Sequence, residues 1–424
     1  MIIARITRMP KMKNWAIAIV SAIACCVVIS PAAATLPTLP ASGRAALGAF
    51  LNQQIADGVV PAVSIVIVNR EQQLVLDAAG KRDAAKNVPL TPDSIFRIAS
   101  MTKPITSLAV MMLHEEGKIG FDDPVTKYLP EYERVRVMTS FNDADRTFES
   151  RPPARPITVR HLLTHTSGIG YAFADARLAK IDDGKKTEVE MPLLHDPGER
   201  FTYGPNTAVL GYIIEKVTGQ TLDAFLRAHI FDPVGMRDTF YVVPADERDR
   251  VVTQHMKVSG PFTERPNPET LQSPVRGDGG LFSTATDYGK FVQVFLNGGR
   301  AGGTRLVTEA SLRLMTSNQL GTLVVQEQPS ANTMIARPFP FGGGKDTFGF
   351  GFQIETALSR NEDRGLRSPG SYSWGGIYNT HFWIDPQRQI AVAVLMQVLP
   401  YYDEAAIQVL RGVERLVYQH LIRL

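Results

Sequence analysis

Strand-like segments lie near both ends of this sequence, and helical patterns fill much of the long stretch between them. Residues 63–68 form a short, mostly β-branched run, and residues 74–76 return after a polar turn, which is typical of a β-hairpin. Near the other end, the strand-like runs 381–384 and 390–397 flank an Asp-Pro turn. This arrangement predicts one antiparallel sheet built from both chain ends and flanked by helices, an α/β (α+β) architecture.

The same pattern predicts the domain organisation. Residues 35–95 and 277–424 would form an α/β domain, and residues 96–276 a mostly helical domain inserted into it. A helix is expected over residues 100–116, where Pro104 is tolerated in the first turn, and Asp403 is a candidate N-cap of a final helix. Three further expectations are a Pro/Ala-rich linker at 35–41, a mobile insertion at 324–346 and a strand over 348–355.

The first 34 residues resemble a secretory signal peptide. A basic region ending at Lys13 precedes an apolar run over 15–29, and Ala32-Ala33-Ala34 suits signal-peptidase cleavage after Ala34. We therefore expect a periplasmic or secreted protein with no stable membrane insertion once the signal is removed. An alternative is a lipoprotein modified at Cys25, although Ala22 stands where a lipobox has leucine. The chain has no cysteines outside this segment, so a thiol nucleophile is not expected.

Composition and missing motifs exclude several other classes. The chain has 424 residues, 44% apolar and 21% charged, and its net charge of +3 comes without a basic stripe that would suggest nucleic acid. The eight histidines show no zinc-binding spacing, so no metal is expected. Neither a G-x-x-x-x-G-K-[ST] loop nor a G-x-S-x-G elbow occurs, and we expect no cofactor.

Ser100-Met101-Thr102-Lys103 is an S-x-x-K motif at the start of the helix expected over 100–116. At positions i and i+3 the two side chains face each other, and the helix N-terminus favours a developing alkoxide. A lysine desolvated there could lose its proton and activate the Ser100 hydroxyl. A helix-capping serine beside a solvated lysine would have the same pattern, so the motif alone leaves both interpretations open.

Further segments, in order along the chain, resemble the serine β-lactamase and penicillin-binding-protein superfamily, especially class C β-lactamases and family VIII carboxylesterases. The similar segments are Phe96-Arg97-Ile98-Ala99 directly before Ser100, Leu162-Leu163-Thr164-His165-Thr166-Ser167-Gly168, Pro197-Gly198-Glu199, Phe201-x-Tyr203, Gly279-Gly280-Leu281-Phe282-Ser283-Thr284 and Trp374-Gly375-Gly376. The resemblance covers most of the chain after residue 34.

The resemblance implies roles for individual residues. Ser100 would be the nucleophile, and Lys103 and Tyr203 would exchange its proton. The backbone N–H groups of Ser100 and Ile377 would form the oxyanion hole. An edge strand carrying Trp374, Gly375 and Gly376 would bind substrate, as would Asn206. Three polar residues in similar segments, His165, Glu199 and Asp278, are interpreted as structural.

Two departures from the family pattern bear on the reaction. β-Lactamases have a Tyr-x-Asn motif, whereas in this sequence the third residue of the motif is Pro205 and Asn206 follows it. In the other motif, Lys-Thr-Gly, Trp374 replaces the lysine. Both changes favour hydrolysis of carboxylic esters, with neutral esters preferred to β-lactams. Alternatives are a β-lactamase or D-Ala-D-Ala carboxypeptidase and a non-catalytic penicillin-recognising cell-wall binding module. The expected partner is a small-molecule ester or β-lactam-like substrate.

Overall fold

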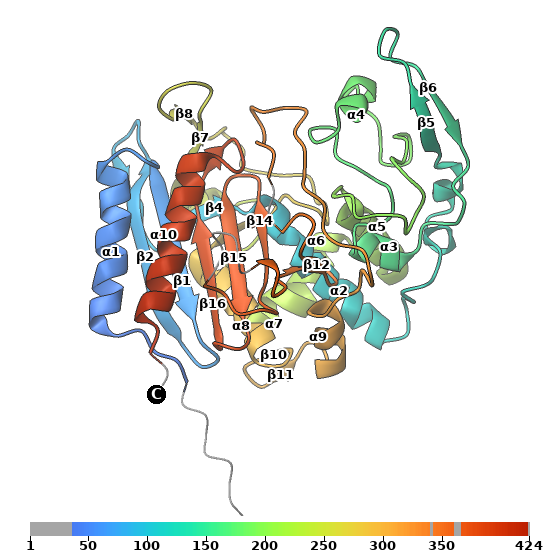
Figure 1. The fold of residues 1–424 in the computed structure, drawn as a ribbon. Helices are drawn as coiled ribbons and strands as arrows, with labels where there is room; N and C mark the ends of the chain where they lie inside the picture. The colour runs from blue at the N-terminus through green and yellow to red at the C-terminus, as the bar shows by residue number, and fades with distance from the viewer. Residues whose placement is uncertain (1–35, 340–341, 360–365, 423–424) are drawn as a thin grey trace, which may run out of the picture. The chain divides into compact units, whose positions relative to one another are not determined.

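A large sheet joins segments from the two ends of the chain in the computed structural model, which describes residues 36–339, 342–359 and 366–422 (Figure 1). Strand β1 (Ala62–Val68) pairs antiparallel with β16 (Ile390–Leu395) on one side and with β2 (Gln73–Asp83) on the other. The antiparallel sheet expected from both chain ends is therefore confirmed. Its strand order is β12–β13–β14–β15–β16–β1–β2–β3, and its other strands are β3 (Val88–Pro89), β12 (Thr347–Phe348), β13 (Gln353–Ile354), β14 (Tyr372–Gly376) and β15 (Thr380–Asp385).

Alternate side chains of the central strands enter two different cores. Ile65 packs with α1 (Ala41–Ala56) and α10 (Glu404–His420) on one face, whereas the next residue, Val66, belongs to the core that includes α8 (Ala285–Leu296). Figure 1 shows α1 and α10 together on one face of the sheet. Because β1 is buried along its whole length, its sequence is apolar throughout except for Ser64 and does not alternate.

The remaining elements surround the S-x-x-K segment. Strand β4 (Ile95–Arg97) pairs with β9 (Phe282–Thr284) and leads into a 3₁₀ turn, Ala99–Thr102, followed by α2 (Lys103–Glu115). The helices of the central and later chain are α3 (Val159–Leu163), α4 (Ala176–Ile181), α5 (Asn206–Thr218), α6 (Leu222–Leu226), α7 (Asp232–Val234) and α9 (Glu309–Met315). Short strands outside the main sheet are β5 (Val137–Phe141), β6 (Phe148–Arg151), β7 (Gln254–Met256), β8 (Thr263–Arg265), β10 (Arg300–Ala301), β11 (Thr304–Arg305) and β17 (Val398–Leu399).

Three local expectations need correction. The helix expected from Ser100 begins as an α-helix only at Lys103, because a 3₁₀ turn precedes it. The strand expected over 348–355 is two short strands, since Gly351 adopts a positive φ of 99° in the turn between them. The described part of the expected linker, residues 36–41, packs against the far end of the chain: Thr38 exchanges backbone hydrogen bonds with Ile422.

Other expectations lie beyond what the structure describes. The signal peptide over 1–34 and Cys25 fall outside the described residues. In the part that is described, no helix combines the length and apolar character needed to cross a bilayer, and no three His, Cys, Asp or Glu side chains gather as a metal site would require. Residues from Leu36 onward form one compact unit by their contacts, and the boundaries expected at 95/96 and 276/277 stay a prediction.

Substituting Gly376 with alanine should destabilise the protein. An added Cβ would lie 2.3 Å from the Ile98 carbonyl oxygen and 2.4 Å from Thr380 Oγ1, so either β14 or the turn before Ser100 must move. Overpacking of this kind typically costs about 1–3 kcal/mol of unfolding free energy, measurable by urea denaturation. Gly303→Ala is the matched control, since nothing lies within 4 Å of its added Cβ. Equal stabilities of the two variants would contradict the expectation.

Candidate active site

Ser100 lies on a tight turn between β4 and α2. Ala99, directly before it, has a φ of +45°, a conformation that costs a residue with a Cβ on the order of 1–3 kcal/mol. Tertiary contacts hold this turn in place: Ile98 donates a backbone hydrogen bond to Leu281 O, and its own carbonyl accepts one from Thr380 Oγ1. The strained turn presents Ser100 to a cavity of about 420 Å³.

Lys103 is buried beneath Ser100 with every N–H of its ammonium group occupied. The Nζ atom donates to Ser100 Oγ at 3.1 Å, to Tyr171 Oη at 3.0 Å and to the Asp278 carbonyl oxygen at 2.7 Å. Only 1% of the side chain is exposed. Three acceptors suit an ammonium group, which has three donors and no lone pair. This geometry gives Lys103 an electrostatic and positioning role toward Ser100.

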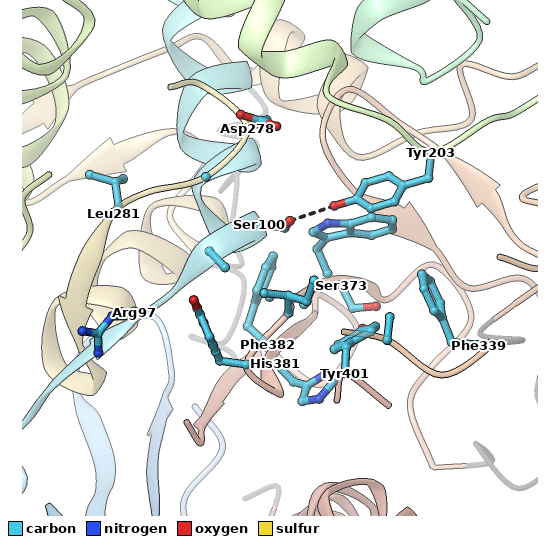
Figure 2. Close-up of a pocket in the computed structure, with 18 of the residues that line it drawn as sticks. Arg97, Ser100, Tyr203, Asp278, Leu281, Phe339, Ser373, His381, Phe382 and Tyr401 are labelled. Atoms are coloured by element: carbon cyan, nitrogen blue, oxygen red, sulfur yellow. Dashed lines mark hydrogen bonds between the residues drawn. The ribbon is translucent and has the colours of Figure 1, made fainter. Parts of the chain in front are cut away.

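Tyr203, in the segment before α5, contacts Ser100 through its hydroxyl. Its hydroxyl lies 2.8 Å from Ser100 Oγ, the contact drawn as a dashed line in Figure 2. Lys103 Nζ lies 4.9 Å from the centre of the Tyr203 ring. The segment before α5 carries Tyr203 close to the chain at Ile169, because Gly204 leaves room where a Cβ would lie 2.1 Å from the Ile169 carbonyl oxygen. The structure thus brings Ser100, Lys103 and Tyr203 together.

Behind Lys103, a buried polar network supplies negative charge. Tyr171 donates to Asp278 Oδ2 at 2.6 Å, and Arg276 pairs with Asp278 and with Glu188. Burial alone would raise the pKa of the Asp278 carboxyl, but Lys103 and Arg276 hold it below its usual value. Burial, reinforced by Asp278, raises the pKa of Tyr171 well above its usual value, so this phenol keeps its proton.

His165 and Asn206 form a separate buried contact under the Tyr203 ring. Asn206 Nδ2 donates to His165 Nδ1 at 2.8 Å, and Asn206 Oδ1 accepts from Ser167 Oγ. Asn206 is the first residue of α5, is fully buried and is not among the residues that line the cavity, so its expected part in binding substrate stays a prediction. The ring of His165 packs 5.1 Å from that of Tyr203, which agrees with the structural role assigned to it.

The Trp374-Gly375-Gly376 segment lines the cavity, as expected, but it is not an edge strand throughout. β13 pairs with β14 at Tyr372 and Ser373, and only the following residues have no strand on that side. Trp374 packs against Tyr203, with ring centres 5.0 Å apart. The glycine at 376 is required by the close approach of Ile98 rather than by a ligand.

Two backbone N–H groups are available at the cavity wall. Ser100 and Ile377 both line the cavity. Within the described residues, neither N–H donates to a protein acceptor. Two such donors beside a nucleophile can stabilise the negative oxygen of a tetrahedral intermediate. The expected oxyanion-hole residues are therefore placed in the same cavity as the Ser100 hydroxyl.

The segment expected to be a mobile insertion, 324–346, forms part of the cavity wall in its described residues. Ala336 and Phe339 line the cavity. Ala331 donates to the Phe173 carbonyl oxygen, and Arg337 to that of Tyr401, so the segment is tied to two other lining residues. Ordered backbone pairing at both of these positions places the segment across one side of the cavity.

Three polar contributors were not assigned functional roles from the sequence. Tyr171 and Arg276 had no role, and Asp278 was interpreted as structural, yet all three form the network around Lys103. Arg276 and Asp278 stand two residues apart just before the Gly-Gly-Leu segment, which is the only local signal that could have suggested them. Glu199 lies outside the cavity wall and accepts from the Asp196 backbone, as a structural residue would.

The fold and this site define a class of protein, and the chain belongs to it: a family model described as Beta-lactamase matches residues 47–413. Among curated proteins, Protein Rv1367c of Mycobacterium tuberculosis is 32% identical over 81% of this chain and 87% of its own. Lovastatin esterase of Penicillium rubens is 30% identical over 76% of this chain and 85% of its own. Among solved structures, the LovD6 mutant of simvastatin synthase (LovD) from Aspergillus terreus is similar in fold, with a TM-score of 0.76, 24% identity and coverage of 89% and 95%.

Lowering the pH below about 6.5 should destabilise the protein. Burial lowers the pKa of His161 to about 4, that of His381 to about 3 and that of His165 well below 6.5. The unfolded chain protonates these rings near pH 6.5 and the folded chain does not, so between about pH 6.5 and 4 the unfolded state binds more protons. Stability present above pH 6.5 is therefore lost as the pH falls through this window.

Urea unfolding at several pH values across the window would measure this loss. His381→Gln removes one of the titrating rings and should make the decline shallower than in the wild type. An unfolding free energy that stays level as the pH falls from about 6.5 to 5 would contradict the assignment of buried neutral histidines.

Proposed function

We propose that this protein is a serine hydrolase that cleaves carboxylic esters through an acyl-enzyme on Ser100. The observation that carries the proposal is that Ser100 Oγ lies within hydrogen-bond distance of both Lys103 Nζ and Tyr203 Oη. A serine hydroxyl is a weak nucleophile unless a neighbouring group takes its proton. Because the Lys103 donors are all occupied, Tyr203 is the group positioned to exchange that proton.

The proposed reaction has two halves. Tyr203 acts as a phenolate-like base beside the Lys103 ammonium group: Ser100 Oγ attacks the ester carbonyl carbon while its proton passes to the Tyr203 oxygen. The N–H groups of Ser100 and Ile377 stabilise the oxyanion. The bond to the alcohol oxygen then breaks, and Tyr203 returns the proton to the departing alcohol. Water attacks the acyl-enzyme by the same route, which releases the carboxylic acid and restores Ser100.

Two features support an ester over a β-lactam or a D-Ala-D-Ala peptide. Trp374 stands where the family often has a lysine that meets the substrate carboxylate, and the Asn206 amide is engaged with His165 and Ser167. One relative bears the name lovastatin esterase. A leaving alkoxide also needs less protonation than a leaving amine.

The non-catalytic alternative is disfavoured by the same cluster. A binding module has no need for a serine held between a buried ammonium group and a phenol at the end of a strained turn.

On the expected signal peptide alone, we also propose that the mature enzyme acts in the periplasm or outside the cell.

Ser100→Ala should abolish ester turnover while leaving the fold intact. Loss of the nucleophile commonly lowers kcat by several orders of magnitude, with some residual rate from binding and the oxyanion hole. Hydrolysis of p-nitrophenyl butyrate and labelling by a fluorophosphonate probe would measure this. Ser107→Ala in α2, the helix that follows Ser100, is the matched control and should keep both activities, since Ser107 does not line the cavity. A Ser100→Ala enzyme retaining more than about a tenth of wild-type kcat would show that another residue attacks.

The wild-type enzyme should hydrolyse p-nitrophenyl butyrate faster than a chromogenic cephalosporin, measured as kcat/KM. Trp374→Lys should shift this preference toward the cephalosporin by roughly ten- to 150-fold, because a hydrogen bond to a charged group is worth about 1.5–3 kcal/mol. Trp374→Phe is the control, since it removes the indole without adding a cation. A wild-type enzyme that prefers the cephalosporin would overturn the ester assignment.

A further inference from the structure

Several cationic side chains line the cavity, and Arg97 differs from the others whose partners the structure describes. Two of these cations are paired with carboxylates: Arg276 with Asp278 and Glu188, and Arg367 with Glu355 and Glu414. Within the described chain, no carboxylate forms an ion pair with Arg97; its acceptors are the Val252 carbonyl oxygen at 3.3 Å and Asn267 Oδ1 at 3.0 Å. Both acceptors are neutral, so the charge of Arg97 is not compensated by them.

The Arg97 guanidinium has donors left for a ligand. It carries five N–H donors, and the two described acceptors leave others unused. The side chain is half-buried at the cavity wall, with its guanidinium carbon 5.2 Å from the centre of the Phe282 ring. Burial lowers the pKa of Arg97, because holding a positive charge away from water costs free energy. A bound anion would offset that cost.

The surroundings of Arg97 are already arranged. Asn267, which accepts from the guanidinium, is itself held by a hydrogen bond from its Nδ2 to Val251 O, 2.9 Å away. Tyr378 lines the same cavity as Arg97. A fixed guanidinium and a phenol in one cavity wall supply a planar donor pair and a further O–H donor, which matches a carboxylate.

Arg97 lies within small-molecule reach of the nucleophile. Three residues of fully extended chain span at most about 11 Å, so the Cα atoms of Arg97 and Ser100 cannot be farther apart. Figure 2 shows Arg97 and Tyr203 on opposite sides of Ser100. Trp374 packs on Tyr203, so Arg97 lies away from the position where the family's lysine would stand.

We propose that Arg97, together with Tyr378 of the same cavity wall, binds a carboxylate of the substrate, so that the preferred substrates are monoanionic esters such as half-esters of dicarboxylic acids. This rests on the proposed ester hydrolysis and replaces the expectation that neutral esters are preferred. One uncompensated cation suits one negative charge, which favours a carboxylate monoanion.

Two matched substrate pairs test the proposal, one for each side of the ester bond. The first is p-nitrophenyl hydrogen glutarate with its methyl ester, and the second is 4-acetoxybutanoate with 4-acetoxybutanamide. The wild type should favour the charged member of at least one pair by about tenfold or more in kcat/KM. Arg97→Met should bring that ratio close to one, and Arg97→Lys should retain part of it. Arg313→Met removes a surface charge outside the cavity and should leave the ratio unchanged.

Arg97→Met could fail to fold, because Arg97 contacts Val252 and Asn267. Two further measurements then test the proposal. The ratio of kcat/KM for the charged over the neutral substrate should fall in Tyr378→Phe. In the wild type it should also fall as the ionic strength rises from about 0.05 to 0.5 M. Ratios near one for both pairs in the wild type, or a ratio that neither the substitutions nor salt changes, would overturn the proposal. If the wild type cleaves no ester at all, the proposed ester hydrolysis is wrong. If it cleaves the neutral member of each pair as well as the charged member, only the proposed role of Arg97 is wrong.

Discussion

The pairing of β1 with β16 is the contact on which the rest of the molecule depends. It joins residues 64–68 to residues 391–395 and so closes the sheet across more than three hundred residues of chain. Once β16 is in place, β15 and β14 follow by antiparallel pairing, and the end of β14 reaches the turn that carries Ser100. The intervening chain then has to return to that turn, because β4 pairs with β9. The position of the nucleophile is therefore a property of the sheet as much as of α2.

Burial of the Lys103 ammonium group imposes the second constraint. An ammonium group taken out of water needs an acceptor for each donor, and these come from three separate segments, at Ser100, Tyr171 and Asp278. Arg276 and Glu188 extend the network, so the charges alternate in sign from Lys103 through Asp278 and Arg276 to Glu188. The same groups that make burial of Lys103 tolerable also fix its orientation toward Ser100. Stability and the arrangement of the reactive groups are thus tied to one set of hydrogen bonds.

Much of the fold was predictable because its signals are local. The continuous apolar runs that become β1 and β16, and the Asp403 cap of α10, can be recognised in short windows. The Ser100–Lys103 pair was likewise predictable from its spacing, whereas Tyr203 required the resemblance to a family. The contacts of Tyr171 and Asp278 with Lys103 join segments 68 and 175 residues away, for which no periodicity exists. The contact of the Asn206 amide with His165 also joins distant segments, and the sequence pattern gave no sign of it.

The backbone ties of the 324–346 segment have a consequence for how this scaffold can diversify. Ala336 and Phe339 shape the cavity, but the described residues of the segment contribute no strand to the main sheet and no partner to Lys103. Its anchors at Phe173 and Tyr401 are backbone hydrogen bonds, which constrain side-chain identity little. Insertions, deletions and substitutions in this segment can change the shape of the cavity, while the strained turn at Ala99 and the buried Lys103 ammonium group stay unchanged. Selection can therefore act on the reactive residues and on the cavity wall separately, an arrangement that favours evolvability.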